Sequence, residues 1–504
     1  MKKILILLFI SPFIILSQDY DSHIELGKEF GKTEEYDKSI YEFTKALEID
    51  STEYSAYYYR ATSYYYKKDY DLAIKDYTIY LNVYPDDTIS YFYRGYSYLQ
   101  IDEFQKSIDD YDKYIKVNPI SPSYFNRGLC YYYIDSLSIG VSDFTMALKL
   151  DPSDFEANYY RGLCYYYLDS YENAVEDFSV YIDNDPVKNN VFYYRAFSYS
   201  ELEKYELSLE DYTIYINADP AAVAYTNRAR CYYHLGQYNL AIENYTQSIS
   251  IAPEEYDNWG NYFNRGLSYF YLQKYRLAIE DFNKSIVLDS TDIYGYYNRG
   301  LAYFNLDIYP FALVDFIKAV EMDSTDYLSR YYLGLTHHYM EDYEHSVKNL
   351  SVCLQIDPVA EYALFYRGLG YQYLENPEEA IKDYDKLIEL NTIYPVVYYN
   401  KSLLYQDLEN YKEAVEGYTI AIKMDPEYLD AYYNRALCYG ELEKNSKAIK
   451  DYTKVLSLSE EEPYAYYNRA FAKKKIWLPF CKDLEKACEL GVGCEELKEY
   501  CTEE

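Results

Sequence analysis

Residue types on which catalysis and membrane insertion depend are scarce in this chain. Its 504 residues include only five histidines. No serine, histidine and aspartate follow the pattern of a hydrolytic triad, and no glycine-rich loop of the phosphate-binding type occurs. Beyond residue 16 no apolar run is long enough to cross a bilayer. We therefore expect a protein without enzymatic activity, without a cofactor or metal, and without a segment inserted in a membrane.

Positive charge is also in short supply. The chain has 48 lysines and arginines against 83 aspartates and glutamates, which gives a formal net charge of −35. Nucleic acids and anionic lipid surfaces bind proteins through neutralisation of their phosphates. We therefore expect protein or peptide partners and no nucleic acid. Composition leaves the oligomeric state open.

What the chain has in excess is regularity. At intervals of about 34 residues an arginine recurs, at Arg60, Arg94, Arg127, Arg161, Arg195, Arg228, Arg265, Arg299, Arg367, Arg435 and Arg469. Leu333 and Lys401 occupy the same register where the arginine is missing. We call this register the marker position. A fixed period of this length is typical of an array of small repeated units.

The residues around each marker predict two helices and a short turn. Apolar residues recur at helical spacing on both sides of polar turns such as Leu168-Asp169-Ser170. Small residues follow many markers and open many second helices, and proline ends many units, as at Pro186. These features resemble the tetratricopeptide repeat (TPR), whose unit carries a bulky residue, Leu-Gly, Tyr, Ala, an aromatic residue, Ala and Pro over 34 positions.

The resemblance covers nearly the whole chain after its first residues. With Leu26-Gly27 placed in the first unit, the period accommodates about fourteen units. The family implies an all-α, right-handed superhelical solenoid of helix-turn-helix repeats over residues 18–488, with a C-terminal cap over residues 489–504. The main departure is the arginine at the marker, where the family usually has leucine.

An acidic residue follows most marker arginines at a distance of sixteen positions. Examples are Arg60 with Asp76, Arg161 with Asp177, and Arg299 with Asp315. Where the arginine is missing the acid is missing too, since Leu333 is followed by Asn349 and Lys401 by Gly417. The pattern predicts structural ion pairs between the two helices of a unit. A row of ligand-binding arginines is the alternative.

The first seventeen residues differ in character from the rest. Two lysines precede an apolar run from Ile4 to Leu16, which is too short for a comfortable membrane span. We expect residues 1–17 to be a secretory signal peptide that is cleaved near Ser17. The mature protein is then expected to be periplasmic or secreted.

The nine cysteines form two groups. Five lie within the repeats, where we expect buried thiols, at Cys130, Cys164, Cys231, Cys353 and Cys438. The other four lie symmetrically about Gly491 and are spaced by seven residues on either side. This spacing suits an antiparallel hairpin with the disulfides Cys481–Cys501 and Cys488–Cys494. Zinc ligation and free thiols are the alternatives.

In the TPR family the first helices line a concave groove, and the residue before the marker is expected to point into it. That residue is asparagine at Asn126, Asn227, Asn264, Asn298, Asn400, Asn434 and Asn468. A carboxamide both donates and accepts hydrogen bonds, so it can bind the backbone of an extended peptide. The arrangement is similar to the asparagine ladder of O-linked GlcNAc transferase and importin alpha. The alternative is an exposed asparagine copied by duplication.

Neighbouring positions of the expected groove are aromatic in many units. They include Tyr58, Tyr159, Tyr193, Tyr297, Tyr399 and Tyr433. The chain has 77 tyrosines, and duplication multiplies any tyrosine of the unit, so much of this number is expected to be core. Tyrosines left on an exposed face would form a good binding surface.

Three histidines are grouped in the unit whose marker is Leu333. They are His337, His338 and His345, and they lie near Glu341, Asp342 and Glu344. His337 falls at a core position, while His338 and His345 fall on different helices. We expect an irregular repeat here, with metal binding as the lesser alternative.

The leading hypothesis is a non-enzymatic scaffold that binds an extended polypeptide, or several partners, in its concave groove. One alternative is a structural component of envelope assembly that uses its convex acidic face. A second is a carbohydrate-binding solenoid with tyrosines as stacking platforms. Exposure of the groove tyrosines distinguishes the sugar-binding alternative from the others.

Overall fold

The computed structural model describes residues 12–185, 188–253, 258–391 and 394–501. The expected signal peptide therefore lies mainly outside the described residues, since only the backbone of residues 12–17 is described, as the start of the first helix. All 29 described elements are α-helices. None of them is both long enough and apolar enough to cross a membrane.

The chain divides into two compact units, residues Met1–Glu254 and Glu255–Glu504. The helices of the N-terminal unit are α1 (Pro12–Lys32), α2 (Tyr36–Ile49), α3 (Ser55–Lys67), α4 (Tyr70–Val83), α5 (Thr88–Gln100), α6 (Phe104–Ile115), α7 (Ser121–Tyr133), α8 (Leu137–Leu150), α9 (Phe155–Tyr167), α10 (Tyr171–Asn184), α11 (Asn190–Glu201), α12 (Tyr205–Ala218), α13 (Ala222–His234) and α14 (Tyr238–Ile251). They form repeats 1 to 7, two helices to each repeat.

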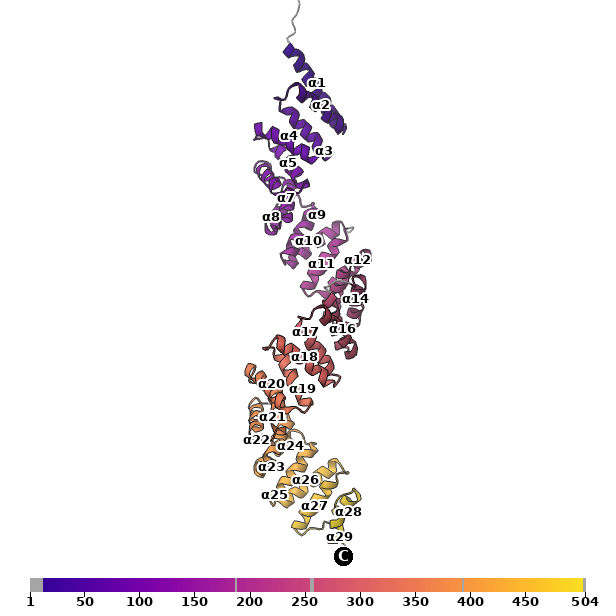
Figure 1. Cartoon of the computed structure of the whole chain (residues 1–504), viewed down its shortest axis with the longest axis vertical. Coiled ribbons are helices and arrows are strands. Elements are labelled where there is room, and N and C mark those ends of the chain that lie inside the picture. Colours follow the sequence, from indigo (N-terminus) through magenta and orange to yellow (C-terminus); the bar gives the residue numbers. More distant parts are fainter. Residues whose placement is uncertain (1–11, 186–187, 254–257, 392–393, 502–504) are drawn as a thin grey trace, which may run out of the picture. The chain divides into compact units, whose positions relative to one another are not determined.

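The C-terminal unit continues the same alternation. Its helices are α15 (Asn258–Tyr271), α16 (Tyr275–Leu288), α17 (Ile293–Phe304), α18 (Tyr309–Met322), α19 (Tyr327–Tyr339), α20 (Tyr343–Ile356), α21 (Glu361–Tyr373), α22 (Pro377–Glu389), α23 (Pro395–Asp407), α24 (Tyr411–Met424), α25 (Leu429–Glu441), α26 (Asn445–Leu458), α27 (Pro463–Lys475), α28 (Cys481–Glu489) and α29 (Cys494–Cys501). They form repeats 8 to 14 and one terminal helix. Within each unit every helix packs against the next one along the chain (Figure 1).

An aromatic ring of the second helix packs against the residue after the marker. A Cβ atom on Gly128 would lie 2.9 Å from the ring of Phe144, and one on Gly162 would lie 2.8 Å from the ring of Phe178. Because the ring fills this space, the small residue is required for the two helices to approach. The position of Phe144 and Phe178 in the second helix carries a buried aromatic residue in most repeats. These residues are Phe43, Tyr77, Tyr111, Phe144, Phe178, Tyr212, Tyr245, Phe282, Phe316, Tyr384, Tyr418 and Tyr452. Many tyrosines are therefore core residues, as expected.

The turn between the paired helices contains a residue in the left-handed conformation, eight positions after the marker. In repeat 7 this residue is Gly236, with φ of 71°. Most other repeats use an acidic residue there, such as Asp169 with φ of 55° and Glu443 with φ of 57°. The left-handed region costs a non-glycine residue about 1–2 kcal/mol. Packing of the two helices therefore imposes the turn on sequences that do not themselves favour it.

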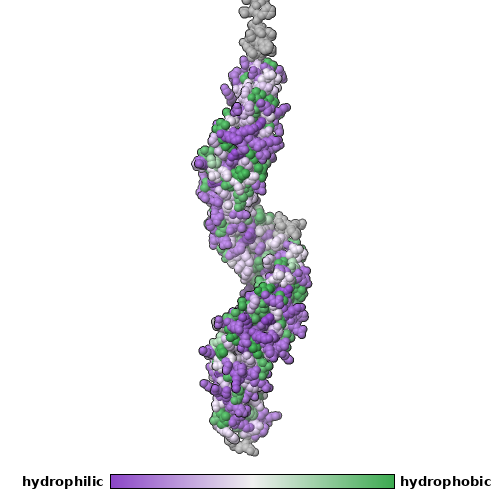
Figure 2. Space-filling model, turned by 90° about the vertical axis from the view of Figure 1, so that its left-hand side faces the viewer, coloured by the Kyte–Doolittle hydropathy of each residue, from purple (hydrophilic) through white to green (hydrophobic). Residues whose placement is uncertain are grey.

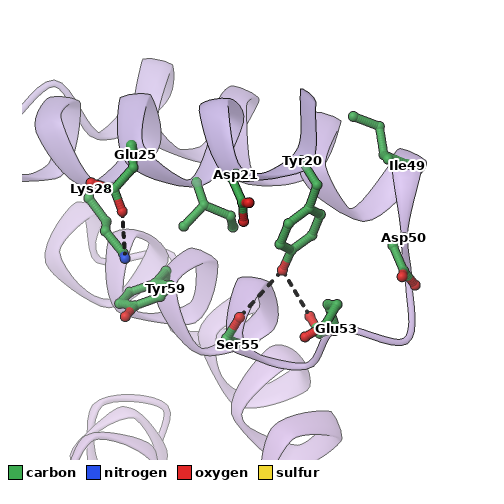
Figure 3. A pocket seen from close by; sticks show the side chains of 10 residues that line it. Tyr20, Asp21, Glu25, Lys28, Ile49, Asp50, Glu53, Ser55 and Tyr59 are labelled. Atoms are coloured by element: carbon green, nitrogen blue, oxygen red, sulfur yellow. Dashed lines mark hydrogen bonds and ion pairs between the residues drawn. The ribbon is translucent and has the colours of Figure 1, made fainter. Parts of the chain in front are cut away.

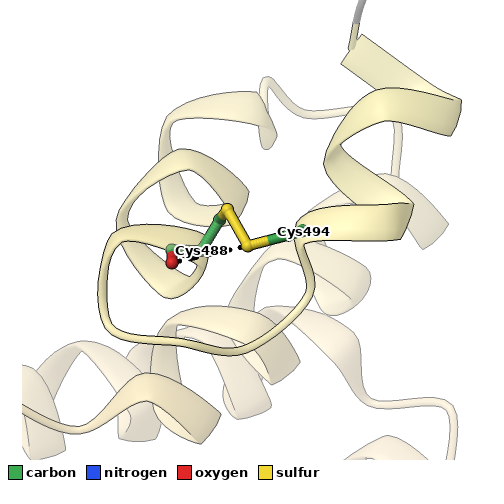
Figure 4. Close-up of a disulfide and its surroundings, with 2 residues drawn as sticks. All are labelled: Cys488 and Cys494. Carbon is green, nitrogen blue, oxygen red and sulfur yellow. Dashed lines mark hydrogen bonds between the residues drawn. A yellow bond between two sulfur atoms is a disulfide. The ribbon is translucent and has the colours of Figure 1, made fainter.

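The C-terminal helices are joined by two disulfides. Cys481 pairs with Cys501 at a Cα–Cα distance of 5.8 Å, and Cys488 pairs with Cys494 at 4.7 Å. Figure 4 shows the second bond linking the end of α28 to the start of α29. The pairing is the one that the cysteine spacing predicts. The other five cysteines are free and buried, also as expected.

Candidate binding surface of the first helices

A buried carboxylate of the same repeat binds every marker arginine except Arg228, whose Nε donates to the carboxamide oxygen of Asn244 at 2.8 Å. In repeat 5, Arg161 Nε donates to Asp177 Oδ2 at 2.8 Å and Nη2 donates to Oδ1 at 2.7 Å. The Asp177 side chain is only 3% exposed. The same two-bonded contact occurs in the pairs Arg60–Asp76, Arg94–Asp110, Arg127–Asp143, Arg195–Asp211, Arg265–Asp281, Arg299–Asp315, Arg367–Asp383, Arg435–Asp451 and Arg469–Asp483. The geometry supports the structural interpretation of the arginines.

Burial and pairing act on these carboxylates in opposite directions. Burial raises the pKa of Asp110 and Asp143 above the ordinary value for aspartate, while the paired guanidinium lowers it. A buried carboxylate that lost its arginine would keep the cost of burial without the compensating attraction. Each repeat that buries this carboxylate therefore needs the arginine to offset the cost of burying it.

A third bond from the arginine reaches the preceding repeat, and the sequence analysis did not predict it. Arg161 Nη1 donates to Thr145 Oγ1 at 3.2 Å, and Arg195 Nη1 donates to Ser179 Oγ at 3.1 Å. Equivalent acceptors are Thr44, Thr78, Asp112, Thr213, Asn283, Ser351, Thr419 and Thr453. The sequence does contain a signal for this bond, because a polar residue stands two positions after the acid in most repeats.

Repeat 10 lacks all three parts of this arrangement at once. Its marker is Leu333, the position of the acid is Asn349, and the acceptor position in the preceding repeat is Ile317. In repeat 12 the marker lysine instead binds the acid of the acceptor position, since Lys401 Nζ donates to Asp385. The marker and both partner positions therefore change together in repeats 10 and 12, whereas in repeat 7 only the acid changes, and Asn244 still accepts a hydrogen bond from Arg228.

The seven predicted asparagines mostly bond within the array. Asn227 donates to the Tyr193 hydroxyl at 3.3 Å, Asn434 to Tyr399 at 3.0 Å, and Asn468 to Tyr433 at 3.0 Å. In each case the tyrosine belongs to the preceding repeat. Asn126, Asn227 and Asn400 are buried, and Asn264, Asn298, Asn434 and Asn468 are half-buried. Asn227, Asn434 and Asn468 thus link neighbouring repeats, whereas Asn264 and Asn298 donate to carbonyl oxygens of their own helices.

The predicted groove tyrosines pack against second helices. The rings of Tyr159 and Tyr181 are 5.2 Å apart, and those of Tyr58 and Tyr80 are also 5.2 Å apart. Tyr159 is buried, while Tyr58, Tyr193, Tyr297, Tyr399 and Tyr433 are half-buried. A platform for sugar stacking requires an exposed ring face, which this packing does not favour.

Exposed apolar residues of the first helices stand at two other positions: near the end of the helix, as at Tyr167 and Tyr373, and five residues before the marker. We call the position five residues before the marker the outer position. In the C-terminal unit it carries Tyr294, Leu328, Tyr362 and Val396 in the consecutive repeats 9 to 12, and Tyr464 in repeat 14. Tyr294 and Tyr362 are each 64% exposed. Sequence reasoning missed this position because it took the residues next to the marker as the binding face.

An apolar pocket lies between the outer positions of repeats 11 and 12. It has a volume of about 220 Å³ and is lined by Glu361, Tyr362, Phe365, Leu387, Tyr394, Val396 and Val397. Tyr362 and Val396 are the two outer residues, and Phe365 lies two positions before its marker. Only one lining residue is charged, so the pocket suits an apolar side chain.

A larger pocket occupies the same register in the N-terminal unit, between α1 and α3 (Figure 3). Its volume is about 750 Å³, and its lining includes four carboxylates, Asp21, Glu25, Asp50 and Glu53, against one lysine, Lys28. Tyr20 lies across it, with its hydroxyl 3.3 Å from Ser55 Oγ and 3.4 Å from the Glu53 carbonyl oxygen. Glu25 accepts a hydrogen bond from Lys28 at 3.0 Å, which raises the pKa of Lys28. The pocket suits a cationic group.

Apolar and hydrophilic residues alternate over the surface of the chain. Figure 2 shows green apolar patches interrupting a mainly purple, hydrophilic surface on the face in view. Scattered exposed apolar residues are common on protein surfaces, so the pocket and the row of outer positions carry the argument for a binding site.

Profiles of known families match most of the repeats. Profiles described as tetratricopeptide repeat match residues 58–124, 126–188, 222–255, 361–392, 395–428 and 429–461, and one described as TPR repeat matches residues 266–307. Together they cover more than half of the chain. The chain is a tetratricopeptide repeat protein. TPR proteins are generally non-catalytic scaffolds that bind other proteins.

Solved TPR structures resemble this chain at low sequence identity. The C-terminal part of a TPR protein from Cytophaga hutchinsonii is 20% identical over 55% of this chain and 98% of its own, with a TM-score of 0.36. A TPR protein from Parabacteroides merdae is 17% identical over 52% and 99%, with a TM-score of 0.34. YrrB, described as a TPR protein with an unusual peptide-binding site, is 22% identical over 38% and 97%, with a TM-score of 0.35. None of the curated proteins compared with the chain matches it.

Proposed function

We propose that the C-terminal unit of this TPR protein binds an extended polypeptide through the outer positions of its first helices. The observation that carries the proposal is the row of exposed apolar side chains in four consecutive repeats, Tyr294, Leu328, Tyr362 and Val396. Tyrosine is enriched among the residues that contribute most to binding, and Tyr362 stands at the edge of a pocket. Because each repeat contributes one exposed side chain to the row, the row suits a partner whose chain is also extended.

The pocket between repeats 11 and 12 supplies the anchor in this proposal. An apolar side chain of the partner enters the space bounded by Tyr362, Phe365 and Val397. The asparagines have a supporting role, since three of the seven are buried and their carboxamides bond to neighbouring repeats. The half-buried Asn264 and Asn298, whose amides donate to carbonyl oxygens of their own helices, remain candidates for contact with the partner backbone.

Selection from a random library of 12-residue peptides tests the proposal. We expect the purified protein to select peptides rich in aromatic and aliphatic residues. Tyr362→Ser should weaken the best peptide at least roughly tenfold, since the loss of a hot-spot tyrosine costs about 1–2 kcal/mol or more. The matched control is Val287→Ser with Val314→Ser, two exposed apolar residues of second helices. Equal affinity for the Tyr362→Ser variant and the control would reject the proposal.

We further propose that the protein matures in an oxidising compartment, periplasmic or extracellular. The two C-terminal disulfides support this, because such bonds persist where thiols are not kept reduced. The repeat cysteines are compatible with it, since burial raises the pKa of Cys130 to about 11 and that of Cys438 to about 12. A thiol held protonated and buried resists oxidation. Mass mapping of non-reduced peptides from the native source, with sequencing of the mature N-terminus, tests both the bonds and the signal peptide.

A further inference from the structure

Repeat 10 replaces the missing arginine arrangement with a different cluster, at the turn between α19 and α20. His337 lies in the last turn of α19, Asp342 precedes α20, and His345 lies in the first turn of α20. His337 Nδ1 is 3.0 Å from Asp342 Oδ2, and His345 Nδ1 is 2.9 Å from the same oxygen. The turn thus unites two histidines that the sequence places on separate helices.

The two imidazole rings are stacked, so that both direct a nitrogen at one carboxylate. Their centroids are 5.1 Å apart and their planes differ by 22°. One ligand atom from each of the three residues lies within 4.8 Å of the others. The side chain of His337 is 12% exposed and that of His345 is 58% exposed, so one side of the cluster is open to water. An ion can therefore enter without rearrangement of the helices.

The distances from each histidine nitrogen to the carboxylate oxygen are close to those required by a small cation. Tetrahedral zinc has bonds of about 2.0–2.1 Å, which places its ligand atoms about 3.3 Å apart. The nitrogen–oxygen distances of 2.9 and 3.0 Å need to increase by only a few tenths of an ångström.

We propose that His337, Asp342 and His345 bind one divalent transition-metal ion, with zinc as the ion that fits best. Two imidazoles and one carboxylate are ligands that zinc prefers, whereas magnesium and calcium favour sites made of oxygen alone. Three protein ligands leave a fourth position for water. This revises the expectation of an irregular repeat without a metal.

The bound ion would do for repeat 10 what the arginine does elsewhere. In other repeats the guanidinium and the carboxylate hold the first helix to the second, as Arg161 and Asp177 do. In repeat 10 neither Leu333 nor Asn349 is a charged residue. Coordination by a residue of α19 and a residue of α20 connects the same pair of helices at their turn. Binding energy for the folded site appears as stability of the repeat.

Asp342 also has a simpler role that the test must separate from metal binding. Its side chain accepts a hydrogen bond from the backbone of His345 at 3.3 Å and so caps α20. Asparagine is an equally good cap but a poor metal ligand. Asp342→Asn therefore keeps the cap while it removes the charged ligand.

The experiment titrates zinc into the chelator-treated full chain by calorimetry, with magnesium in a parallel titration. We expect one zinc ion per chain and a higher unfolding temperature in zinc. Asp342→Asn and His345→Ala should each weaken zinc binding at least tenfold and abolish the rise in unfolding temperature. His234→Ala, in repeat 7, is the matched histidine control and should bind as the unchanged protein does.

Cobalt provides an independent readout of the ligand set, because a tetrahedral cobalt site absorbs visible light strongly. That band should appear with the unchanged protein and with His234→Ala, and not with Asp342→Asn. Three results would each overturn the proposal: no zinc bound at micromolar concentration, equal binding by Asp342→Asn and the unchanged protein, or magnesium bound as tightly as zinc. Zinc captured by buried cysteines of unfolded chains would give the second result.

Discussion

The two units of this TPR protein share their internal contacts and differ in the surface that they build on them. Arg161 in the N-terminal unit and Arg367 in the C-terminal unit make the same two bonds to an aspartate and the same third bond to a hydroxyl. The pockets at the outer positions of the two units have opposite chemistry. The pocket of α1 and α3 has four carboxylates, and the pocket of α21 to α23 has one.

The difference teaches which positions of the repeat are free to specify a partner. The marker and its two partner positions keep matching groups, because a change that leaves a buried polar group without a partner is costly. They change together in repeats 10 and 12, and in repeat 7 Asn244 keeps an acceptor for Arg228. The outer position contacts solvent, so it tolerates aspartate in repeat 1 and tyrosine in repeat 11. Duplication thus preserves the contacts of the marker with its partner positions, while the outer positions diverge.

The largest expected effect tests the arginine–aspartate contacts that the two units share. Arg161→Ala leaves the Asp177 carboxylate buried without a positive partner and with only the hydrogen bond from Asn158, and we expect a loss of about 3–5 kcal/mol in the free energy of unfolding of that part of the array. Arg367→Ala should cost the same in the C-terminal unit. Hydrogen exchange of the flanking helices measures both.

The double variants with the aspartate also replaced by alanine provide the control. Each should be more stable than the corresponding single arginine variant, since no unpaired charge is left. If either single variant were at least as stable as its double variant, or if the two units lost different amounts of stability, the claim that both units share these contacts would be disproved.

The second effect sharpens the contrast between the two pockets. A lysine-rich hexapeptide should bind the N-terminal pocket and lose affinity severalfold between about 50 and 500 mM salt, since exposed charges are screened over about 10 Å at 0.1 M. A peptide selected on the apolar pocket should change less than twofold. Fluorescence anisotropy measures both, and Glu25→Gln with Asp21→Asn is the control for the first. The opposite dependence on salt would refute the assignment of chemistry to the two pockets.

Much of this architecture follows from the sequence because it is repeated. The helix pairs, the Arg161–Asp177 contact and its equivalents recur often enough for coincidence to be excluded. The bond from Arg161 to Thr145 was not predicted, because it joins one repeat to the previous one. A motif sought within a single unit does not contain it. The exposure of Tyr362 was not predicted, because adjacent positions of a helix point about 100° apart. A small error in the expected face of the helix therefore makes buried residues look exposed and exposed residues look buried.

The histidine cluster could not be predicted for a different reason. His337 and His345 meet only because the turn around Glu341 reverses the chain with a φ of 61°, a conformation that glutamate does not favour. The packing of α19 on α20 imposes that turn. No spacing rule for a single helix brings the two rings together.

The third effect is a dependence on pH confined to the C-terminal unit. Burial lowers the pKa of His337 and His338 below the ordinary value of 6.5. The unfolded chain then binds protons more readily than the folded one as the pH falls through about 6.5. Repeat 10 should therefore be most stable above that pH and lose stability progressively between about pH 7 and 5.

His338→Phe is the variant that isolates this effect. The ring of His338 packs among Tyr339, Tyr343 and Tyr366, so phenylalanine fits the same surroundings. The loss of stability of α19 and α20 on acidification, measured by hydrogen exchange in chelator, should become smaller in this variant. An unchanged pH profile would show that the buried histidines are not its source.

The smallest effect concerns the bonds between repeats. Asn434 donates to Tyr399 of the preceding repeat at 3.0 Å, and a hydrogen bond of this kind contributes about 0.5–1.5 kcal/mol. Tyr399→Phe and Asn434→Ala should each cost about that much, and the double variant should cost less than their sum because both remove the same bond. In the N-terminal unit Tyr193→Phe with Asn227→Ala forms the matched cycle. Additive losses in both cycles would mean that the asparagines do not hold the repeats together, and would return them to the list of side chains available to a bound peptide.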